Sequence, residues 1–105
     1  MATSEIKNTV NYCYNSEYLT DSNFTNSASY TTTKDGFYLL QTQNNAADNG
    51  DDLRIVIDGV TVASITLRNA YDKLIIGIPL KSGVAITFIC TNTSLSCNYR
   101  ITRLY

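Results

Sequence analysis

The chain has 105 residues, enough to bury one hydrophobic core and too few for two domains. Its net charge of −1 gives it no electrostatic footprint for nucleic acid or for an anionic membrane surface. Histidine, the commonest general base and transition-metal ligand, is absent. The polar residues are mostly Asn, Ser and Thr, which indicates a neutral surface suited to sugars, other proteins or the outside medium.

The N-terminal part of the sequence is polar and predicts little regular structure. We expect a frayed end over residues 1–5 and a polar first strand over residues 6–14, where Ile6 and Val10 would also fit a helical turn. Residues 15–26 are dense in turn formers and predict a long loop. Its apolar side chains would act as plugs, namely Tyr18, Leu19 and Phe24.

The first ten residues also bear on localisation. They contain no apolar stretch and no cleavage pattern, so we expect no signal peptide and synthesis in the cytoplasm. A role outside the cell would then need another route, such as release on a particle.

Two strands are predicted on either side of a turn at Lys34-Asp35-Gly36. Residues 27–33 are rich in Thr and Tyr and favour a strand. Residues 37–43 form the next strand and are apolar on both faces, with Tyr38 and Leu40 opposite Phe37 and Leu39. Such a strand is either covered on both sides or meets a partner subunit.

Residues 44–51 contain the strongest loop signal in the chain. The carboxylates of Asp48, Asp51 and Asp52 could hold a calcium ion in principle. They lack the spacing of a dedicated calcium loop and its distal glutamate, so we expect no metal site.

An Asp-Gly pair joins the next two alternating runs. Leu53, Ile55 and Ile57 share one parity, and Asp58-Gly59 predicts a tight hairpin into the strand that follows. The apolar parity of that second strand changes near Ala63-Ser64, which predicts a bulge or bend. Residues 68–73 then form a loop that carries Asn69, Tyr71 and Asp72.

Residues 74–89 hold two apolar runs joined by Lys81-Ser82-Gly83. The apolar residues alternate in both runs, and the three-residue connection ends in glycine, so we expect a β-hairpin. The stretch is too short and too interrupted to cross a bilayer. Because Pro79 cannot donate a backbone hydrogen bond, its strand should lie at a sheet edge or carry a bulge.

The last predicted strand, residues 98–105, follows a loop between Cys90 and Cys97. These two cysteines could close the loop as a disulfide, or all three cysteines could be reduced and packed. Three cysteines without a fourth ligand do not favour a zinc site.

In total, the sequence predicts about eight short strands, turns at regular spacing and no convincing helix. This pattern predicts one all-β domain over residues 1–105, a jelly-roll-like sandwich of antiparallel strands. A five-stranded barrel and an immunoglobulin-like sandwich are the alternatives, but the latter lacks its tryptophan.

Three stretches carry a family resemblance, which covers about residues 29–105. Residues 30–38 (YTTTKDGFY) resemble the Tyr-Thr, short gap, Asp-Gly-aromatic pattern of C-terminal head domains of bacteriophage fibres. Residues 57–62 (IDGVTV) and 79–84 (PLKSGV) are similar to a later Asp-Gly-Val strand and a Pro-Leu-Lys-x-Gly turn of those domains. Complement-globular-head and tumour-necrosis-factor-type jelly rolls look similar for the same reasons. No fibre shaft or coiled coil precedes the resembling region, and residues 15–26 have no counterpart.

This resemblance implies a jelly-roll head on a virion, commonly a homotrimer, which recognises a host-surface glycan or protein or decorates the particle. Apolar residues on both faces of several strands point to a subunit contact as well. The residues expected in that contact are Tyr38, Leu40, Ile75 and Leu104.

The favoured function is therefore a non-enzymatic binding or assembly module. Amides and carboxylates can satisfy sugar hydroxyls, and tyrosine can stack on a sugar ring, although Asn and Asp in loops are more often turn formers. The candidate ligand-binding residues are Asn44, Asn45, Asp48, Asn69, Tyr71 and Asp72.

Two other functions are open. A glycosidase would need paired carboxylates across a cleft, and a cysteine nucleophile would lack its histidine, so we predict neither an enzyme nor a cofactor. A small intracellular adaptor or inhibitor that binds one protein partner is compatible with the low charge.

Overall fold

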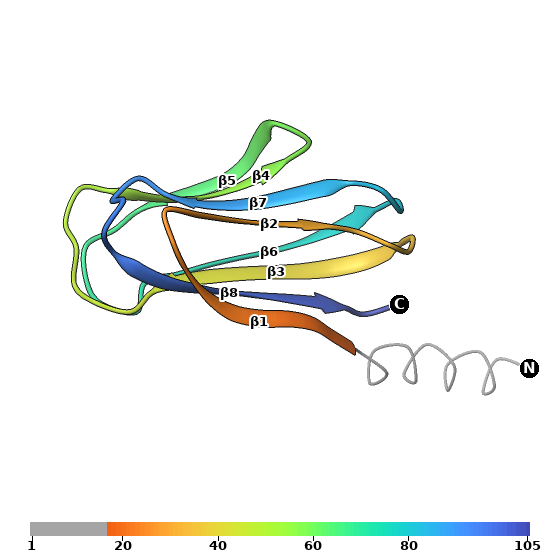
Figure 1. Cartoon of the computed structure of the whole chain (residues 1–105), viewed down its shortest axis with the longest axis horizontal. Coiled ribbons are helices and arrows are strands. Elements are labelled where there is room, and N and C mark those ends of the chain that lie inside the picture. The colour runs from red at the N-terminus through yellow and green to blue at the C-terminus, as the bar shows by residue number, and fades with distance from the viewer. Residues whose placement is uncertain (1–16) are drawn as a thin grey trace, which may run out of the picture.

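The computed structural model describes residues 17–105, with side chains from Leu19 onward, and these residues form eight strands (Figure 1). The predicted strand at residues 6–14 lies outside the described residues. The strands are β1 (Glu17–Thr25), β2 (Ser27–Thr31), β3 (Gly36–Asn44), β4 (Asp52–Ile57), β5 (Val60–Thr66), β6 (Lys73–Leu80), β7 (Ala85–Cys90) and β8 (Ser96–Arg103).

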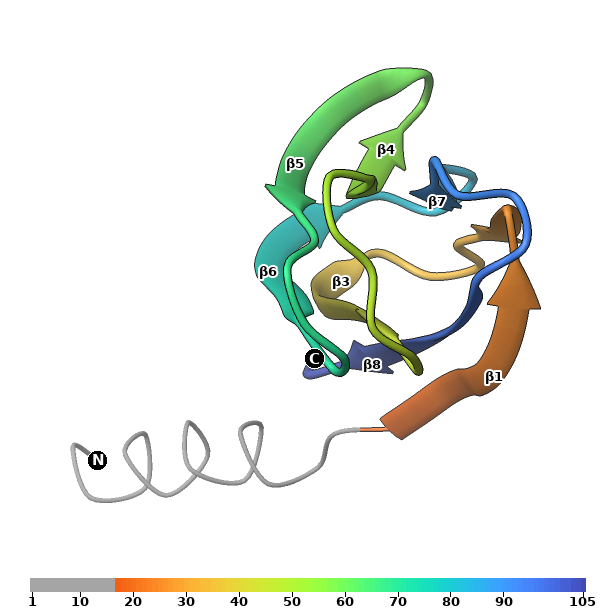
Figure 2. The ribbon, with the colours of Figure 1, turned by 90° about the vertical axis from the view of Figure 1, so that its left-hand side faces the viewer.

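The strands form two facing antiparallel sheets, as the end-on view in Figure 2 shows. One sheet has the order β1-β8-β3-β6 and the other β2-β7-β4-β5. The prediction of an all-β, jelly-roll-like sandwich is confirmed. The described part of the chain contains no helix with the length and apolar character needed to span a membrane.

The core lies between the sheets and is built from one face of each strand. On β3 this face carries Tyr38 and Leu40, both fully buried. Tyr38 can be buried because its hydroxyl donates a hydrogen bond to the carbonyl oxygen of Lys34 at 2.5 Å. These two residues therefore have no surface left for the predicted subunit contact. The opposite parity faces outward, where Leu39 is 36% exposed.

The predicted hairpin over residues 74–89 is wrong in its pairing. Both strands exist, but β6 pairs with β3 in one sheet, whereas β7 pairs with β2 and β4 in the other. The connection between them crosses from sheet to sheet. Thr32 holds it, since its carbonyl accepts a hydrogen bond from Gly83 N at 2.8 Å and its Oγ1 accepts one from Val84 N at 2.9 Å.

The hairpin of β4 and β5 is confirmed. Asp58 and Gly59 have φ values of 47° and 83°, the two positive values that a type I′ turn requires. The predicted bulge is present one to two residues before Ala63-Ser64, since Ile55 pairs with Ala63 and Val56 with Thr61, which leaves Val62 unpaired. Val62 consequently faces outward.

The predicted loop at residues 15–26 is also wrong, because Glu17–Thr25 forms strand β1 and pairs with β8. This strand lies at a sheet edge, where exposed polar residues such as Asp21 and Asn23 are tolerated. Phe24 does enter the core, as predicted, and meets Tyr99 edge to face at 5.8 Å between ring centroids. The edge position predicted for Pro79 is confirmed, since β6 is the other edge strand of this sheet.

Candidate functional site

Three loops meet at one end of the sandwich, which we call the loop end (Figure 2). They connect β3 to β4 (residues 45–51), β5 to β6 (residues 67–72) and β7 to β8 (residues 91–95). Each crosses from one sheet to the other, so loops far apart in sequence come together. The first two loops carry five of the six predicted ligand-binding residues. The sixth, Asn44, is the last residue of β3.

Asn44 ties the first two loops together from inside the protein. It is fully buried, and its Nδ2 donates hydrogen bonds to the carbonyl oxygens of Ala46 at 2.8 Å and Asn69 at 2.7 Å. Its own carbonyl oxygen accepts a hydrogen bond from Tyr71 N at 3.0 Å. Its Oδ1 is buried and has no hydrogen-bond partner within residues 17–105. Asn44 therefore supports the site and has no surface to offer a ligand, contrary to the prediction.

The β3–β4 loop is joined to the β7–β8 loop through Asp48. Its Oδ2 accepts a hydrogen bond from Asn92 Nδ2 at 2.7 Å, and its Oδ1 accepts one from Asp51 N at 3.3 Å. The bond from Asn92 holds the pKa of the Asp48 carboxyl below its ordinary value, although burial works in the opposite direction. The neighbouring Asn45 donates through its backbone N to the Ser96 carbonyl at 2.9 Å.

Asn92 is a residue that sequence reasoning missed. The run of Thr, Asn and Ser between Cys90 and Cys97 indicates a polar loop, but only the folded chain shows that this loop lies beside Asp48.

The β5–β6 loop is closed by Asp72. One carboxylate oxygen of this residue, Oδ2, accepts hydrogen bonds from the backbone N of Arg68 at 2.8 Å and of Asn69 at 2.9 Å. These bonds, with Asn69 first, lower the pKa of the Asp72 carboxyl. The Asp72 carboxylate thus stabilises the backbone of its own loop. The Asn69 side chain is exposed.

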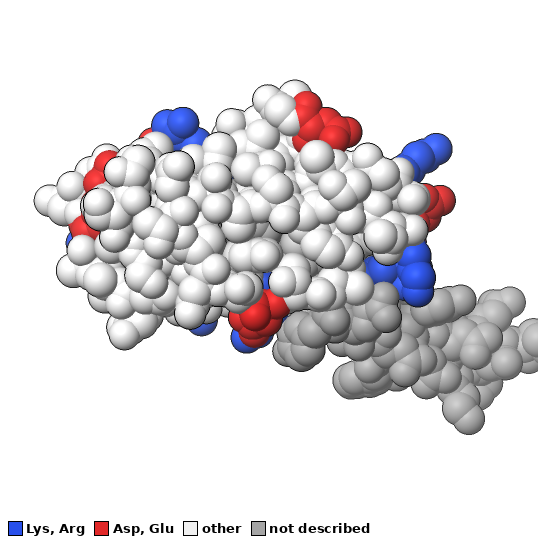
Figure 3. All heavy atoms as spheres, viewed as in Figure 1, with Lys and Arg blue, Asp and Glu red and all other residues white. Residues whose placement is uncertain are grey.

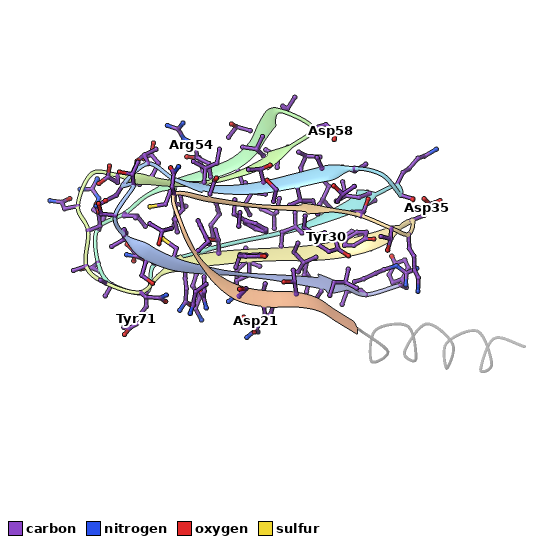
Figure 4. All side chains as sticks on the ribbon, in the orientation of Figure 1. Asp21, Tyr30, Asp35, Arg54, Asp58 and Tyr71 are labelled. Carbon is purple, nitrogen blue, oxygen red and sulfur yellow. The ribbon has the colours of Figure 1, made fainter. Side chains whose placement is uncertain are left out.

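Tyr71 lies in the same loop. Its side chain is 63% exposed, and Figure 4 shows it directed away from the sandwich. Its backbone has a φ of 63°, in the left-handed region that a bulky side chain rarely adopts.

The chemistry available at the loop end is hydrogen bonding and stacking. The lowered pKa values of Asp48 and Asp72 keep both carboxyls ionised at neutral pH, so neither can act there as a general acid. In the described region, no three acidic or cysteine side chains come together as a possible metal site. The exposed amide of Asn69 and the ring of Tyr71 remain to contact a ligand.

The two described cysteines are buried, free thiols beneath this end of the sandwich. Burial and, to a smaller extent, the neighbouring Cys90 together raise the pKa of the Cys97 thiol to about 12. A thiol with so high a pKa is a poor nucleophile at neutral pH.

A second surface feature lies on the outward face of β3 and β6. The register pairs Phe37 with Pro79, Leu39 with Gly77 and Gln41 with Ile75. Because Tyr38 and Leu40 point inward, all of these residues point outward. Tyr105 extends the row by stacking on Phe37 at 6.1 Å between ring centroids. We call the apolar residues of this row the outer strip: Phe37, Leu39, Ile75, Pro79 and Tyr105.

Glycine at position 77 is what lets the outer strip pack as one surface. A Cβ at this position would lie 2.9 Å from the Phe37 ring and 3.4 Å from a methyl of Leu39. The predicted interface residue Ile75 is 54% exposed and belongs to the strip, whereas Leu104, another of the predicted set, is half-buried. Figure 3 shows another side of the molecule, where β1 and β2 face the viewer; this side is mostly uncharged, with charged groups mainly near its margins.

Comparison with known proteins identifies the fold of this chain and no family. No protein-family model matches it, and no curated protein matches it. GITRL from pika is similar in structure, with a TM-score of 0.61 and 9% identity over 73% of this chain and 72% of that chain.

Two carbohydrate-related modules are similar over a larger share of the chain. The C-terminal CBM6 of LamC from Zobellia galactanivorans has a TM-score of 0.51 and 12% identity over 83% of this chain and 93% of that one. A family 35 carbohydrate binding module from Clostridium thermocellum has a TM-score of 0.51 and 12% identity over 86% and 92%. At these identities the likeness establishes the fold alone, a jelly-roll-like sandwich.

Proposed function

We propose that the protein is a non-enzymatic binding module that holds a host-surface glycan at its loop end. The observation that carries the proposal is the presence there of an exposed tyrosine, Tyr71, and an exposed amide, Asn69, two residues apart in the β5–β6 loop. These groups lie on a loop that Asn44 and Asp72 hold in place, and a rigid site of this kind loses little entropy on binding.

The acid–base character of the loop end supports a binding role over an enzymatic one. Glycoside hydrolysis requires one carboxyl that stays protonated near neutral pH as well as a second that is ionised. Asp48 and Asp72 both have pKa values shifted downward.

The outer strip supports the second part of the proposal, that the protein is a homo-oligomer on a particle surface. A contiguous exposed apolar surface commonly marks an interface, and the resemblance to phage fibre heads implies a trimer. The contact then involves Ile75 and Leu39 in place of Tyr38 and Leu40. In this role the protein is a head or decoration domain of a virion.

Glycan binding is tested by affinity electrophoresis of the purified protein in gels that contain laminarin, xylan or dextran. Retardation by at least one polysaccharide, without release of reducing sugar, is expected. If none of the polysaccharides retards the protein and it adsorbs to no host cell, glycan recognition is refuted.

The oligomeric state is tested by size-exclusion chromatography with light scattering. The substitution Ile75→Asp in the outer strip is expected to dissociate the oligomer. Val62→Asp is the matched control, since Val62 is 42% exposed on the other sheet. A wild-type protein that stays monomeric at high concentration refutes this part of the proposal.

An adaptor that binds one protein partner is the alternative. The exposed valines of the β4–β5 hairpin, Val60 at 63% and Val62 at 42%, favour it because they place apolar surface at a projecting tip. Pull-down from host lysate with wild-type protein and with a Val60→Ser variant distinguishes the two functions, because only the adaptor function predicts loss of the captured partner.

A further inference from the structure

The backbone of Tyr71 is in a conformation that its side chain disfavours. Three residues other than glycine have positive φ in the described chain: Asn26, Asp58 and Tyr71. Asn and Asp adopt this region readily because their short polar side chains fit it. The side chain of Asp58 also gains a tertiary hydrogen bond, since its Oδ1 accepts one from Ala85 N of β7 at 2.9 Å. A tyrosine has neither advantage, so its presence there calls for another cause.

Packing of the Tyr71 side chain does not supply that cause. Within residues 17–105, its ring makes no stacking contact and its hydroxyl no hydrogen bond. Other tyrosines do contribute to the fold: Tyr38 donates to Lys34, and Tyr99 stacks on Phe88 at 5.0 Å. The most exposed tyrosine of the described residues thus has a side chain that neither stacks nor hydrogen-bonds within them.

The loop around Tyr71 is nevertheless fixed on both sides. Tyr71 N donates to the Asn44 carbonyl at 3.0 Å, and Asn44 Nδ2 donates to the Asn69 carbonyl at 2.7 Å. On the other side, the Asp72 carboxylate accepts from Arg68 N and Asn69 N. These bonds hold the disfavoured backbone in place, and the ring is presented to solvent as a result.

We propose that Tyr71 is the residue on which a pyranose ring of the ligand stacks, and that Asn44 and Asp72 are positioning residues that present it. This assignment rests on the proposed function and narrows it to sugars with an exposed apolar C–H face. A tyrosine ring packs on such a face and loses few rotatable bonds in doing so. The exposed amide of Asn69 is placed to hydrogen-bond a hydroxyl of the same sugar.

The first test combines binding with stability. Tyr71→Gly removes the ring and relieves the positive φ, so we expect at least a tenfold loss of affinity for the polysaccharide that retards the wild type. The thermal midpoint should not fall. Tyr71→Phe keeps the ring and should bind within about twofold of wild type. Equal retardation of wild type and Tyr71→Gly overturns the stacking role and leaves glycan binding intact, whereas a wild type retarded by no polysaccharide overturns both.

The second test separates positioning from general stability. Asp72→Ala should weaken binding severalfold because it frees the loop. Asp35→Ala is the matched control, since Asp35 Oδ1 likewise accepts a hydrogen bond from a loop amide, Ser82 N at 2.8 Å, but at the opposite end of the sandwich (Figure 4). Equal weakening by both substitutions refutes the positioning role.

A third measurement locates the contact directly. Nitration followed by mass spectrometry should show that the bound polysaccharide protects Tyr71 and leaves Tyr105 unprotected, although Tyr105 is 53% exposed. Unchanged nitration of Tyr71 in the saturated complex contradicts the assignment.

Discussion

Replacement of Asn44 tests how the loop end is built. Asn44→Ala removes the two hydrogen bonds that Nδ2 donates to Ala46 and Asn69, bonds of 2.8 and 2.7 Å that connect two loops. Asn44→Asp keeps the size of the side chain but replaces the donor with a second acceptor. The buried carboxylate would then face two carbonyl oxygens. Asn45→Ala is the control, because Asn45 Nδ2 makes one long bond of 3.4 Å to Ser96 Oγ.

The magnitudes follow from the partners of each atom. Loss of two hydrogen bonds costs about 2 kcal/mol, and removal of the unpartnered Oδ1 returns about 1 kcal/mol. Asn44→Ala should therefore lower the free energy of unfolding by about 1 kcal/mol, or the thermal midpoint by about 4–8 °C. Asn44→Asp leaves an unpaired buried charge and should cost at least about 3 kcal/mol. Asn45→Ala should change stability by less than about 0.5 kcal/mol.

Urea unfolding followed by circular dichroism and tyrosine fluorescence measures all three variants. The expected order of stability is Asn45→Ala, then Asn44→Ala, then Asn44→Asp. If Asn44→Asp is as stable at neutral pH as Asn44→Ala, Asn44 does not act through donation to the two loops, and the account of the loop end is refuted.

Three further outcomes are expected. The folded-state pKa values of Asp48 and Asp72 lie below 3.8, so these carboxylates stabilise the fold fully above that pH and lose their contribution as the pH falls through the lower folded-state values. The urea midpoint should therefore decline between about pH 5 and about pH 2.5. A midpoint that rises on acidification contradicts this. Cys97, with a pKa raised to about 12, should resist iodoacetamide at about pH 8 in the folded protein and react once it is unfolded, as mass spectrometry would show; rapid alkylation of the native protein argues against its burial. Gly77→Ala places a methyl 2.9 Å from the Phe37 ring and should cost about 1 kcal/mol by displacing that half-buried ring, measured by urea unfolding; an unchanged midpoint means that the ring moves freely.

Sequence patterns predicted most strands because alternation of apolar residues shows which face is buried. They did not predict which strands are neighbours, because a buried face is compatible with either sheet. β6 and β7 illustrate this limit: their alternation is correct, yet they lie in different sheets. β1 was missed for another reason. An edge strand with polar residues such as Asp21, Ser22 and Asn23 has the composition of a loop.

In the candidate site, too, sequence patterns predict one part and miss another. The loops that carry it follow from their turn-forming residues, and the structure brings them to one end. The roles within them depend on partners 25 and 44 positions away, as in the bonds from Asn44 to Asn69 and from Asn92 to Asp48. The alternation of β3 would place Asn44 on the buried face if the strand were known to reach that residue, but its neighbours Asn45 and Ala46 favour a loop. No local pattern indicates that Asn92 takes part.

The strand order has a consequence for how the protein is made. Of the eight strands in the described residues, only β4 and β5 pair with a sequence neighbour, while β8, the last of the eight to be translated, lies between β1 and β3. The sheet that contains β1 cannot form completely until residue 103 has been translated. Until then, the backbone hydrogen-bonding groups of β1 and of one edge of β3 have no strand to pair with. Folding should be slow for a chain of this size, and premature stop codons before β8 should yield aggregates instead of a smaller folded domain.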